Sequence, residues 1–157
     1  MKFNTSLSSV LLALAALSQA IPTPDALPDG FEPISSEEVR RRMAEPQGSM
    51  AKRTPGGIYL CTGENYSGTC GYAVQPVCGS GQCSTASSIA QHCVILTSPY
   101  LRNIGSFGPD SGATVYLSTN GNCNEAVASI SNPGSGKFFE YAGGIGHQIT
   151  SFLVFAS

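Results

Sequence analysis

The stretch Ile58-Tyr59-Leu60-Cys61-Thr62 decides the fold, because its side chains alternate between two faces as they do on a β-strand. A similar stretch, Val115-Tyr116-Leu117-Ser118-Thr119, occurs later in the chain. Each is followed by a Gly/Asn turn and then by a cysteine, and the pattern Ile-x-Ser-Phe ends both halves, at 104–107 and 149–152. We therefore expect two related units of about four strands each, arranged as a duplicated Greek key.

Short strands separated by turns continue through the whole region from Thr54 to Ser157, which has the length of one domain. Turn residues stand between the strands, as at Gly79-Ser80-Gly81 and Asn132-Pro133-Gly134. The further strand candidates are Thr69–Gln75, His92–Leu96, Asn103–Phe107, Glu125–Ile130, Lys137–Tyr141 and Gln148–Ala156. Ser84–Gln91 is the one short stretch with helical character. This pattern predicts an all-β sandwich or barrel.

Strand parity predicts the core. Ile58 and Leu60 share one face of their strand, and Val115 and Leu117 share the equivalent face of theirs. The last strand, Gln148–Phe155, is apolar on both faces, with Ile149, Leu153 and Phe155 on one side and Phe152 and Val154 on the other. A strand that is apolar on both faces is usually central or covered, so we expect this strand at the centre of the fold.

All 6 cysteines follow the dibasic pair Lys52-Arg53: they are Cys61, Cys70, Cys78, Cys83, Cys93 and Cys123. An even set confined to one segment is typical of disulfides formed in an oxidising compartment. No Cys-x-x-Cys spacing occurs, which argues against a redox or zinc site. Of the many possible pairings we favour Cys61–Cys70 across the first hairpin, Cys78–Cys83 around a glycine turn, and Cys93–Cys123 between the units.

Residues 1–20 have the three parts of a secretory signal peptide. Lys2 gives a positive start, Leu7–Leu17 is mostly apolar, and Ser18-Gln19-Ala20 is a small-x-small cleavage pattern. The apolar run is too short to span a bilayer, which takes about 20 residues. We expect a secreted, extracellular protein.

Residues 21–53 read as a disordered pro-segment, because they are rich in charge and proline and poor in large apolar residues. Ser35–Arg40 has the pattern of one or two helical turns. Lys52-Arg53 ends the segment and resembles the site of a kexin-type processing protease. The alternatives are a cut at Arg40–Arg42, or a pair of exposed bases that is not cleaved.

The mature region, 54–157, resembles the βγ-crystallin superfamily in the form seen in small secreted fungal proteins. Tyr66-Ser67-Gly68 stands where that family places an aromatic-x-Gly hairpin, and Ser106 stands at the serine that bonds back to that hairpin. The second unit keeps the serine, as Ser151, but has Cys123 and Glu125 opposite Tyr66 and Gly68. The resemblance implies two Greek-key motifs that form one disulfide-stapled sandwich.

The same family often binds calcium through an acidic or amide pair ahead of Ile-Ser/Thr-Ser. This chain has Arg102-Asn103 and His147-Gln148 at those positions. Calcium prefers six to eight oxygen ligands, including carboxylates, so we expect no metal or other cofactor beyond weak calcium binding at most.

The remaining features favour a binding protein over an enzyme. The mature region has few cations, which argues against nucleic acid and anionic membranes as partners. His92, His147 and Asp110 could be drawn as a hydrolase triad, but no Gly-x-Ser-x-Gly elbow is present. Asn65-Tyr66-Ser67 is a glycosylation sequon. Tyr59, Tyr72, Tyr100, Tyr116 and Tyr141 suit either a recognition surface or cross-strand packing, and we favour packing.

We therefore expect a monomeric, non-enzymatic, secreted interaction protein. The family resemblance implies a fungal effector or a cell-wall-associated factor, with a host or cell-wall component as its partner. The alternatives are a killer-toxin-like antimicrobial protein and an extracellular stress or structural βγ-crystallin. Fold alone does not decide among them.

Overall fold

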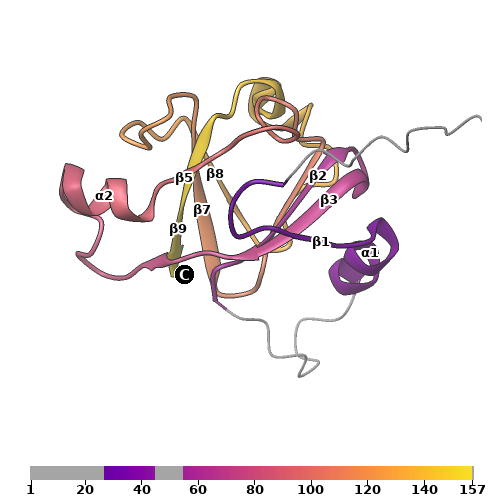
Figure 1. Cartoon of the computed structure of the whole chain (residues 1–157), viewed down its shortest axis with the longest axis horizontal. Coiled ribbons are helices and arrows are strands. Elements are labelled where there is room, and N and C mark those ends of the chain that lie inside the picture. The colour runs from indigo at the N-terminus through magenta and orange to yellow at the C-terminus, as the bar shows by residue number, and fades with distance from the viewer. Residues whose placement is uncertain (1–26, 45–54, 157) are drawn as a thin grey trace, which may run out of the picture.

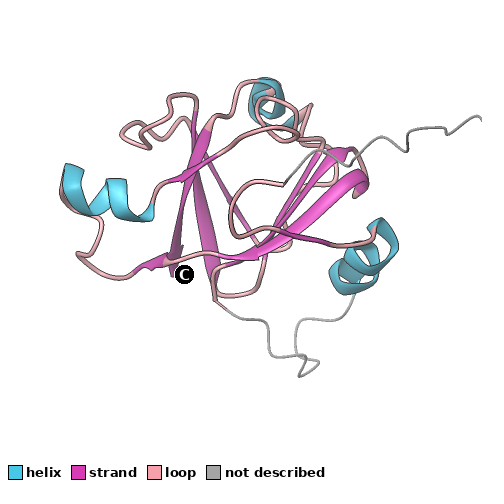
Figure 2. Cartoon of the chain, viewed as in Figure 1, coloured by secondary structure: helices cyan, strands magenta, loops and turns pink. Residues whose placement is uncertain are grey.

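A computed structural model describes residues 27–44 and 55–156 as two packed β-sheets with helices at the periphery (Figure 1; Figure 2). The signal peptide, 1–20, and the Lys52-Arg53 site lie outside the described residues. The first sheet has the order β1 (Glu32–Pro33), β3 (Ser67–Val74), β2 (Gly57–Gly63), β6 (Ser106–Pro109). The second sheet has the order β4 (Val77–Cys78), β9 (Ser151–Ala156), β7 (Ala113–Ser118), β8 (Ala128–Ser131), and β5 (Val94–Ile95) also pairs with β9. The helices are α1 (Ser36–Ala44), α2 (Ala86–His92), η1 (Tyr141–Gly143) and η2 (Ile145–His147).

The two units cross between the sheets. Strands β2, β3 and β6 come from the first unit, while β4 and β5 of that unit leave them and pair with β9 of the second. Ser135 of the second unit forms an isolated bridge to Phe107 on β6. This crossing of the two units confirms the duplicated Greek-key sandwich that the sequence predicts.

The core between the sheets confirms the parity argument. Ile58, Leu60, Val115 and Leu117 are all 0% exposed and belong to one cluster. On β9, Phe152 and Val154 join this core, while Leu153 and Phe155 lie on the opposite face among the cysteines and Ile89 of α2. The last strand is therefore covered on both faces. Ile149 precedes β9 and packs into the core between the sheets, not with Leu153.

Three disulfides pair all six cysteines, in the arrangement that we favoured from the sequence. Cys61 and Cys70 face each other across β2 and β3, with a Cα–Cα distance of 4.1 Å. Cys78–Cys83 closes the turn after β4. Cys93–Cys123 joins the residue after α2 to the second unit. The disulfides thus close one hairpin and one turn, and tie the two units together.

Some predicted strands are wrong or shifted. Residues 137–141 form no strand, because Phe138 turns into the core and the chain coils through η1 and η2 at Gly143-Gly144. The strand predicted at 103–107 is β6, which begins three residues later, at Ser106. Of the strand predicted at 92–96, only the two residues of β5 are observed, because α2 extends to His92. The helical prediction at 84–91 is confirmed by α2, which Thr85 caps.

The prediction of disorder across 21–53 is wrong for residues 27–44. Two residues of this segment form β1 along β3, and α1 lies against the outer face of the first sheet (Figure 1). Phe31 and Val39 are 7% and 0% exposed. Composition indicates that the segment cannot build a core of its own, but its few apolar residues find partners on the folded domain.

Candidate functional site

The outer face of the first sheet carries a cluster of tyrosines around a disulfide. On β2 and β3, Tyr59 is paired with Tyr72 and Cys61 with Cys70. The two rings lie 4.6 Å apart between centroids, and Tyr66 of the intervening hairpin packs against the same cluster. We call Tyr59, Tyr66, Tyr72 and the Cys61–Cys70 disulfide the tyrosine face. Helix α1 covers it.

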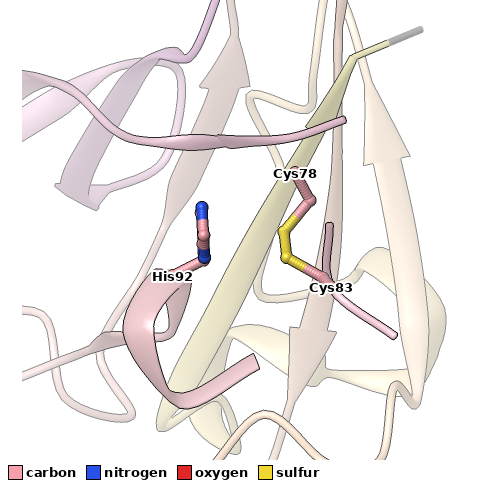
Figure 3. A group of neighbouring side chains, drawn as sticks. All are labelled: Cys78, Cys83 and His92. Atoms are coloured by element: carbon pink, nitrogen blue, oxygen red, sulfur yellow. A yellow bond between two sulfur atoms is a disulfide. The ribbon is translucent and has the colours of Figure 1, made fainter. Parts of the chain in front are cut away.

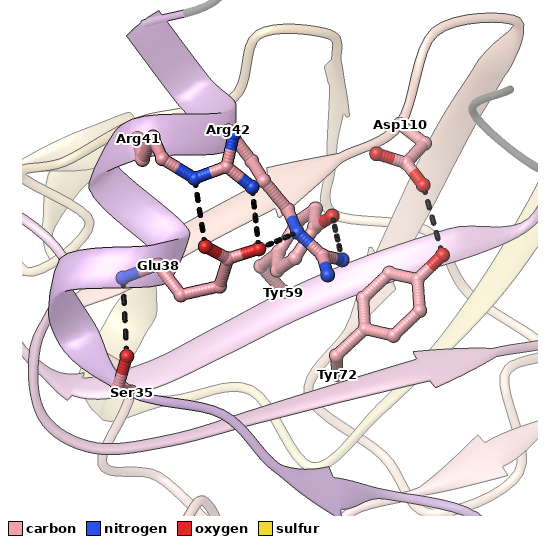
Figure 4. Close-up of polar contacts among 7 residues, drawn as sticks. All are labelled: Ser35, Glu38, Arg41, Arg42, Tyr59, Tyr72 and Asp110. Atoms are coloured by element: carbon pink, nitrogen blue, oxygen red, sulfur yellow. Dashed lines mark hydrogen bonds and ion pairs between the residues drawn. The ribbon is translucent and has the colours of Figure 1, made fainter. Parts of the chain in front are cut away.

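Local sequence explains why α1 forms and which side it buries. The Ser35 hydroxyl accepts a 3.1 Å hydrogen bond from the backbone N–H of Glu38, which caps the first turn (Figure 4). Val39 and Met43 are four residues apart, so they share one side of the helix. Both pack against the tyrosine face, and Val39 is completely buried there.

Arg42 places a guanidinium against both paired tyrosines. Its Cζ atom lies 5.7 Å from the ring centroid of Tyr72 and 6.0 Å from that of Tyr59, within reach of cation–π attraction. Its Nη1 donates a 3.1 Å hydrogen bond to the Tyr59 hydroxyl, and its Nε donates to Glu38 (Figure 4). These bonds, to Tyr59 first and Glu38 second, raise the pKa of Arg42 further above its ordinary value.

Glu38 orders the basic side of α1. Its carboxylate accepts 2.7 and 2.8 Å hydrogen bonds from Arg41 and a further one from Arg42 (Figure 4). The bonds from Arg41 and then Arg42 lower the pKa of Glu38 to about 2. Glu38 therefore holds Arg42 in the orientation that meets the two rings.

A buried carboxylate lies at the other edge of the same tyrosine pair. The Tyr72 hydroxyl donates a 3.0 Å hydrogen bond to Oδ2 of Asp110, which is 2% exposed (Figure 4). Burial, followed by the negative charge of Asp110, raises the pKa of Tyr72 above its ordinary value. Gly57 is required beside this pair, because a Cβ there would lie 2.0 Å from the carboxylate and 2.5 Å from the hydroxyl.

The residues ahead of α1 pack near a further tyrosine, Tyr100. The rings of Phe31 and Tyr100 lie 5.9 Å apart between centroids, and Leu27 packs against the same core cluster. A Cβ at Gly71 would lie 2.7 Å from the Tyr100 hydroxyl, 3.3 Å from Phe31 and 3.5 Å from Leu27. The Tyr100 side chain is 0% exposed, and its hydroxyl has no hydrogen-bond partner among the described residues. Burial raises the pKa of Tyr100. The N-terminal segment therefore forms part of the surroundings of this buried hydroxyl.

The two Greek-key serines hold equivalent positions in the two units. Ser106 Oγ accepts a 2.8 Å hydrogen bond from the Tyr66 N–H and donates to the carbonyl of Gly63. Ser151 Oγ donates to the carbonyl of Asn120 in the second hairpin. Tyr66 and Cys123, which we aligned from the sequence, both have positive φ angles, 54° and 56°. The second hairpin therefore keeps the left-handed backbone at this one position without the aromatic residue.

The residues considered for a hydrolase triad each make separate contacts. His92 Nδ1 donates a 2.9 Å hydrogen bond to the Ser88 carbonyl at the end of α2. His147 stacks on Phe139 with 4.1 Å between centroids, and Asp110 bonds to Tyr72. These contacts fix side chains within the fold.

His92 stands beside the Cys78–Cys83 disulfide (Figure 3). The three side chains place their possible ligand atoms within 4.8 Å of one another, and they are the one such group found in 27–44 and 55–156. The thiolate form of cysteine is the metal ligand, and both sulfurs are used in the disulfide. The oxidised cluster therefore has one imidazole to offer a metal.

At the positions that align with the βγ-crystallin calcium motif, both amide side chains donate to the local backbone. Asn103 Nδ2 donates a 3.1 Å hydrogen bond to the Pro99 carbonyl, and Gln148 Nε2 donates a 3.4 Å bond to the Gly144 carbonyl. Both residues are exposed, as is the neighbouring Arg102. Asn65 of the sequon is exposed in the first hairpin, while Tyr66 beside it is half-buried and burial raises its pKa to about 12.

The covered tyrosine face was not predicted from the sequence. Packing was the favoured role for the tyrosines, and Tyr59 and Tyr100 are buried, but residues 27–44, which were expected to be disordered, provide part of that packing. Two signals for α1 were present: the Ser35-x-x-Glu38 spacing of a helix cap, and Glu38 four residues before Arg42. Nothing local to α1 identifies its binding partner on the sheet.

No protein-family model and no curated protein matches the chain. A solved chain described as "Evolution of the eye lens beta-gamma-crystallin domain fold" is similar in structure, with a TM-score of 0.46 and 12% sequence identity over 70% of this chain and 95% of the other. The likeness concerns the fold, and no ligand or activity follows from it. None of the described helices has the length and hydrophobicity needed to cross a membrane.

Proposed function

We propose that the protein is a secreted, non-enzymatic interaction domain, acting as a fungal effector or a cell-wall-associated factor. The observation that carries this proposal is the complete pairing of the cysteines within a charge-poor sandwich. Disulfides of this kind persist in oxidising, extracellular surroundings, and the signal-like residues 1–20 suit the same destination.

The surface of the sandwich supports a binding role. Several large apolar side chains on it are 42–58% exposed: Val74, Ile95, Leu101, Tyr116 and Val127. Exposed tyrosine and aliphatic side chains suit recognition of a protein or a carbohydrate. The histidines and Asp110 are engaged in packing and hydrogen bonds, which favours a structural role for each over catalysis.

The experiment compares binding targets directly. The oxidised protein secreted from the full chain is incubated with insoluble chitin, β-glucan and host extracellular extract, and is infiltrated into candidate host tissue. We expect retention on one of these materials or a host response. The same preparation is added to cultures of competing microbes, where growth inhibition at low dose would favour the antimicrobial alternative.

A matched control separates specific binding from unfolding. The reduced and alkylated protein has the same composition without the disulfide framework, so specific retention should disappear in it. Turnover of a polymer or peptide substrate by the oxidised protein would contradict the non-enzymatic role. Equal retention of oxidised and reduced protein would contradict recognition by the folded surface.

A further inference from the structure

We propose that the tyrosine face is a binding surface for an arginine-bearing amphipathic helix, which α1 occupies in the precursor and which cleavage after Arg53 opens to a partner. This inference deepens the proposed binding role and rests on it. The occupant is identified by what already lies on the face: one helix side that presents Val39, Arg42 and Met43.

The arginine is recognised by three features at once. The two paired rings receive the flat guanidinium, the Tyr59 hydroxyl accepts one of its protons, and the Asp110 carboxylate lies behind the hydroxyl of Tyr72. A guanidinium stacks on aromatic rings and donates in its own plane, whereas an ammonium is a compact and strongly hydrated charge. The face therefore distinguishes arginine from lysine.

Apolar contacts fix the position of the helix around the arginine. Val39 is fully buried, and Met43 reaches Gly108, where a Cβ would lie 3.0 Å from its sulfur. A partner helix that fits must present an apolar residue, an arginine three residues later, and a second apolar residue immediately after it. Such a side is common to amphipathic helices that dock in grooves.

Residues 27–44 make few backbone hydrogen bonds to the rest of the domain. Strand β1 contributes two residues to the sheet, and Ile34 N–H donates a 3.2 Å hydrogen bond to the Cys70 carbonyl. Leu27 and Phe31 pack near the buried Tyr100 hydroxyl, which has no hydrogen-bond partner in the described part of the chain. A buried hydroxyl without a partner costs free energy, and this cost is recovered when water reaches it.

Cleavage changes how well α1 competes with a free partner helix for the tyrosine face, although the contacts of α1 with that face stay the same. In the precursor, residues 45–56 connect α1 to β2, so α1 competes at the high effective concentration of a tethered ligand, about millimolar for a short linker. After cleavage following Arg53 the segment is a separate chain that dilutes away, and a free helix of equal affinity can then replace it.

The test is peptide exchange on the secreted chain, with and without treatment by a kexin-type protease. The probe is a fluorescent synthetic peptide of residues 27–44, followed by anisotropy. We expect it to bind the cleaved protein at least tenfold more tightly than a protease-treated K52A/R53A precursor. Peptides with Arg42→Ala or Arg42→Lys should bind at least tenfold more weakly, while Arg40→Ala, at an exposed position on the same helix, should bind unchanged.

A second probe tests the partner chemistry. An alanine- and glutamine-based helix that keeps only the valine, arginine and methionine at their spacing should displace the labelled peptide, and the same helix with lysine for arginine should not. Failure of this displacement would overturn the assignment of an arginine-bearing helix as the occupant.

Other outcomes also overturn the proposal. Equal binding of the peptide to cleaved and uncleaved protein is one such outcome, and equal affinity of the Arg42→Ala and Arg40→Ala peptides is another. Absence of cleavage at Lys52-Arg53 is a third. The fourth is a cleaved protein that does not exchange its segment and also loses its circular dichroism spectrum. The assay contains no wall polymer or host material, so its failure leaves the proposed role standing. Loss of binding to those materials would leave the exchange result intact.

Discussion

Ser106 joins two parts of the first Greek key: its hydroxyl accepts a 2.8 Å hydrogen bond from the backbone N–H of Tyr66, 40 positions earlier. The hydroxyl proton goes to the carbonyl of Gly63 at the start of the same hairpin. Ser106 is 0% exposed, so its hydroxyl cannot exchange these two backbone partners for water without moving the strand. One side chain therefore determines how the hairpin folds over the sheet.

The first prediction concerns this bond. Ser106→Ala removes the side-chain partner of a part-buried donor and a part-buried acceptor, and an unpaired buried group costs about 1–3 kcal/mol. We expect the free energy of unfolding to fall by about 2–3 kcal/mol. Because the chain has no tryptophan, far-ultraviolet circular dichroism in urea is the measurement.

Ser151→Ala is the matched control, since the Ser151 hydroxyl donates to Asn120 and serves one carbonyl. It should cost about half as much, because a carbonyl retains other ways to be satisfied. An equal or larger loss in the Ser151 variant would contradict the view that the first hairpin depends more on its serine.

The second prediction concerns Gly68 in the same hairpin. Its φ angle is +75°, and a Cβ would lie 2.5 Å from the hydroxyl oxygen of Thr62. That oxygen accepts a 3.0 Å hydrogen bond from the Thr69 N–H, so it cannot rotate away without losing the bond. Gly68→Ala should therefore add a clash to the left-handed strain of about 1–2 kcal/mol.

Gly112→Ala isolates the strain term. Gly112 has a φ angle of +83° and nothing within 4 Å of the position of a Cβ. Thermal unfolding should rank the Gly68 variant below the Gly112 variant by at least about 1 kcal/mol, the value of one lost hydrogen bond. The same melting temperature in both variants would show that Thr62 moves at no cost.

The third prediction separates the disulfides by loop length. Cys93–Cys123 spans 30 positions and Cys78–Cys83 spans 5. Loop closure in the unfolded chain predicts losses of about 3–4 kcal/mol on removing the longer link and about 2 kcal/mol on removing the shorter one. Paired Cys→Ala variants, compared by urea unfolding, test this, and a greater loss from the shorter loop would contradict it.

Local patterns in the sequence predicted much of the sandwich. Alternation at Ile58 and Leu60 indicates a strand that buries the face carrying these two residues. The local pattern predicts this burial without knowledge of which other elements pack against the face, and both residues are buried. The same reasoning failed at Phe138. Phe138 lies in a turn that leads into η1, and its ring stacks on that of Tyr141, three residues later, with 5.5 Å between the ring centroids. A short apolar run does not distinguish a strand from such a turn.

The covered tyrosine face was not predictable in the same way. Val39 is surrounded in sequence by charged residues, and its burial depends on Tyr59 and the disulfide of a segment that follows it in the chain. Composition describes what a segment can do alone. The partner that orders it comes from tertiary structure, and no window of sequence contains both.

The fourth prediction follows from Glu38, whose pKa is lowered from 4.5 to about 2 by its bonds to Arg41 and Arg42. Since the folded state favours the carboxylate, its contribution to holding α1 is complete above pH 4.5 and is lost as the pH falls through 2. Hydrogen-exchange protection of the Val39 amide, corrected for the intrinsic rate, should therefore fall between pH 4.5 and 2. In Glu38→Gln the protection should be low throughout and should lose this step, whereas Glu37→Gln, an exposed neighbour on α1, should retain it. A step that persists in the Glu38 variant would mean that another acid controls the docking of the helix.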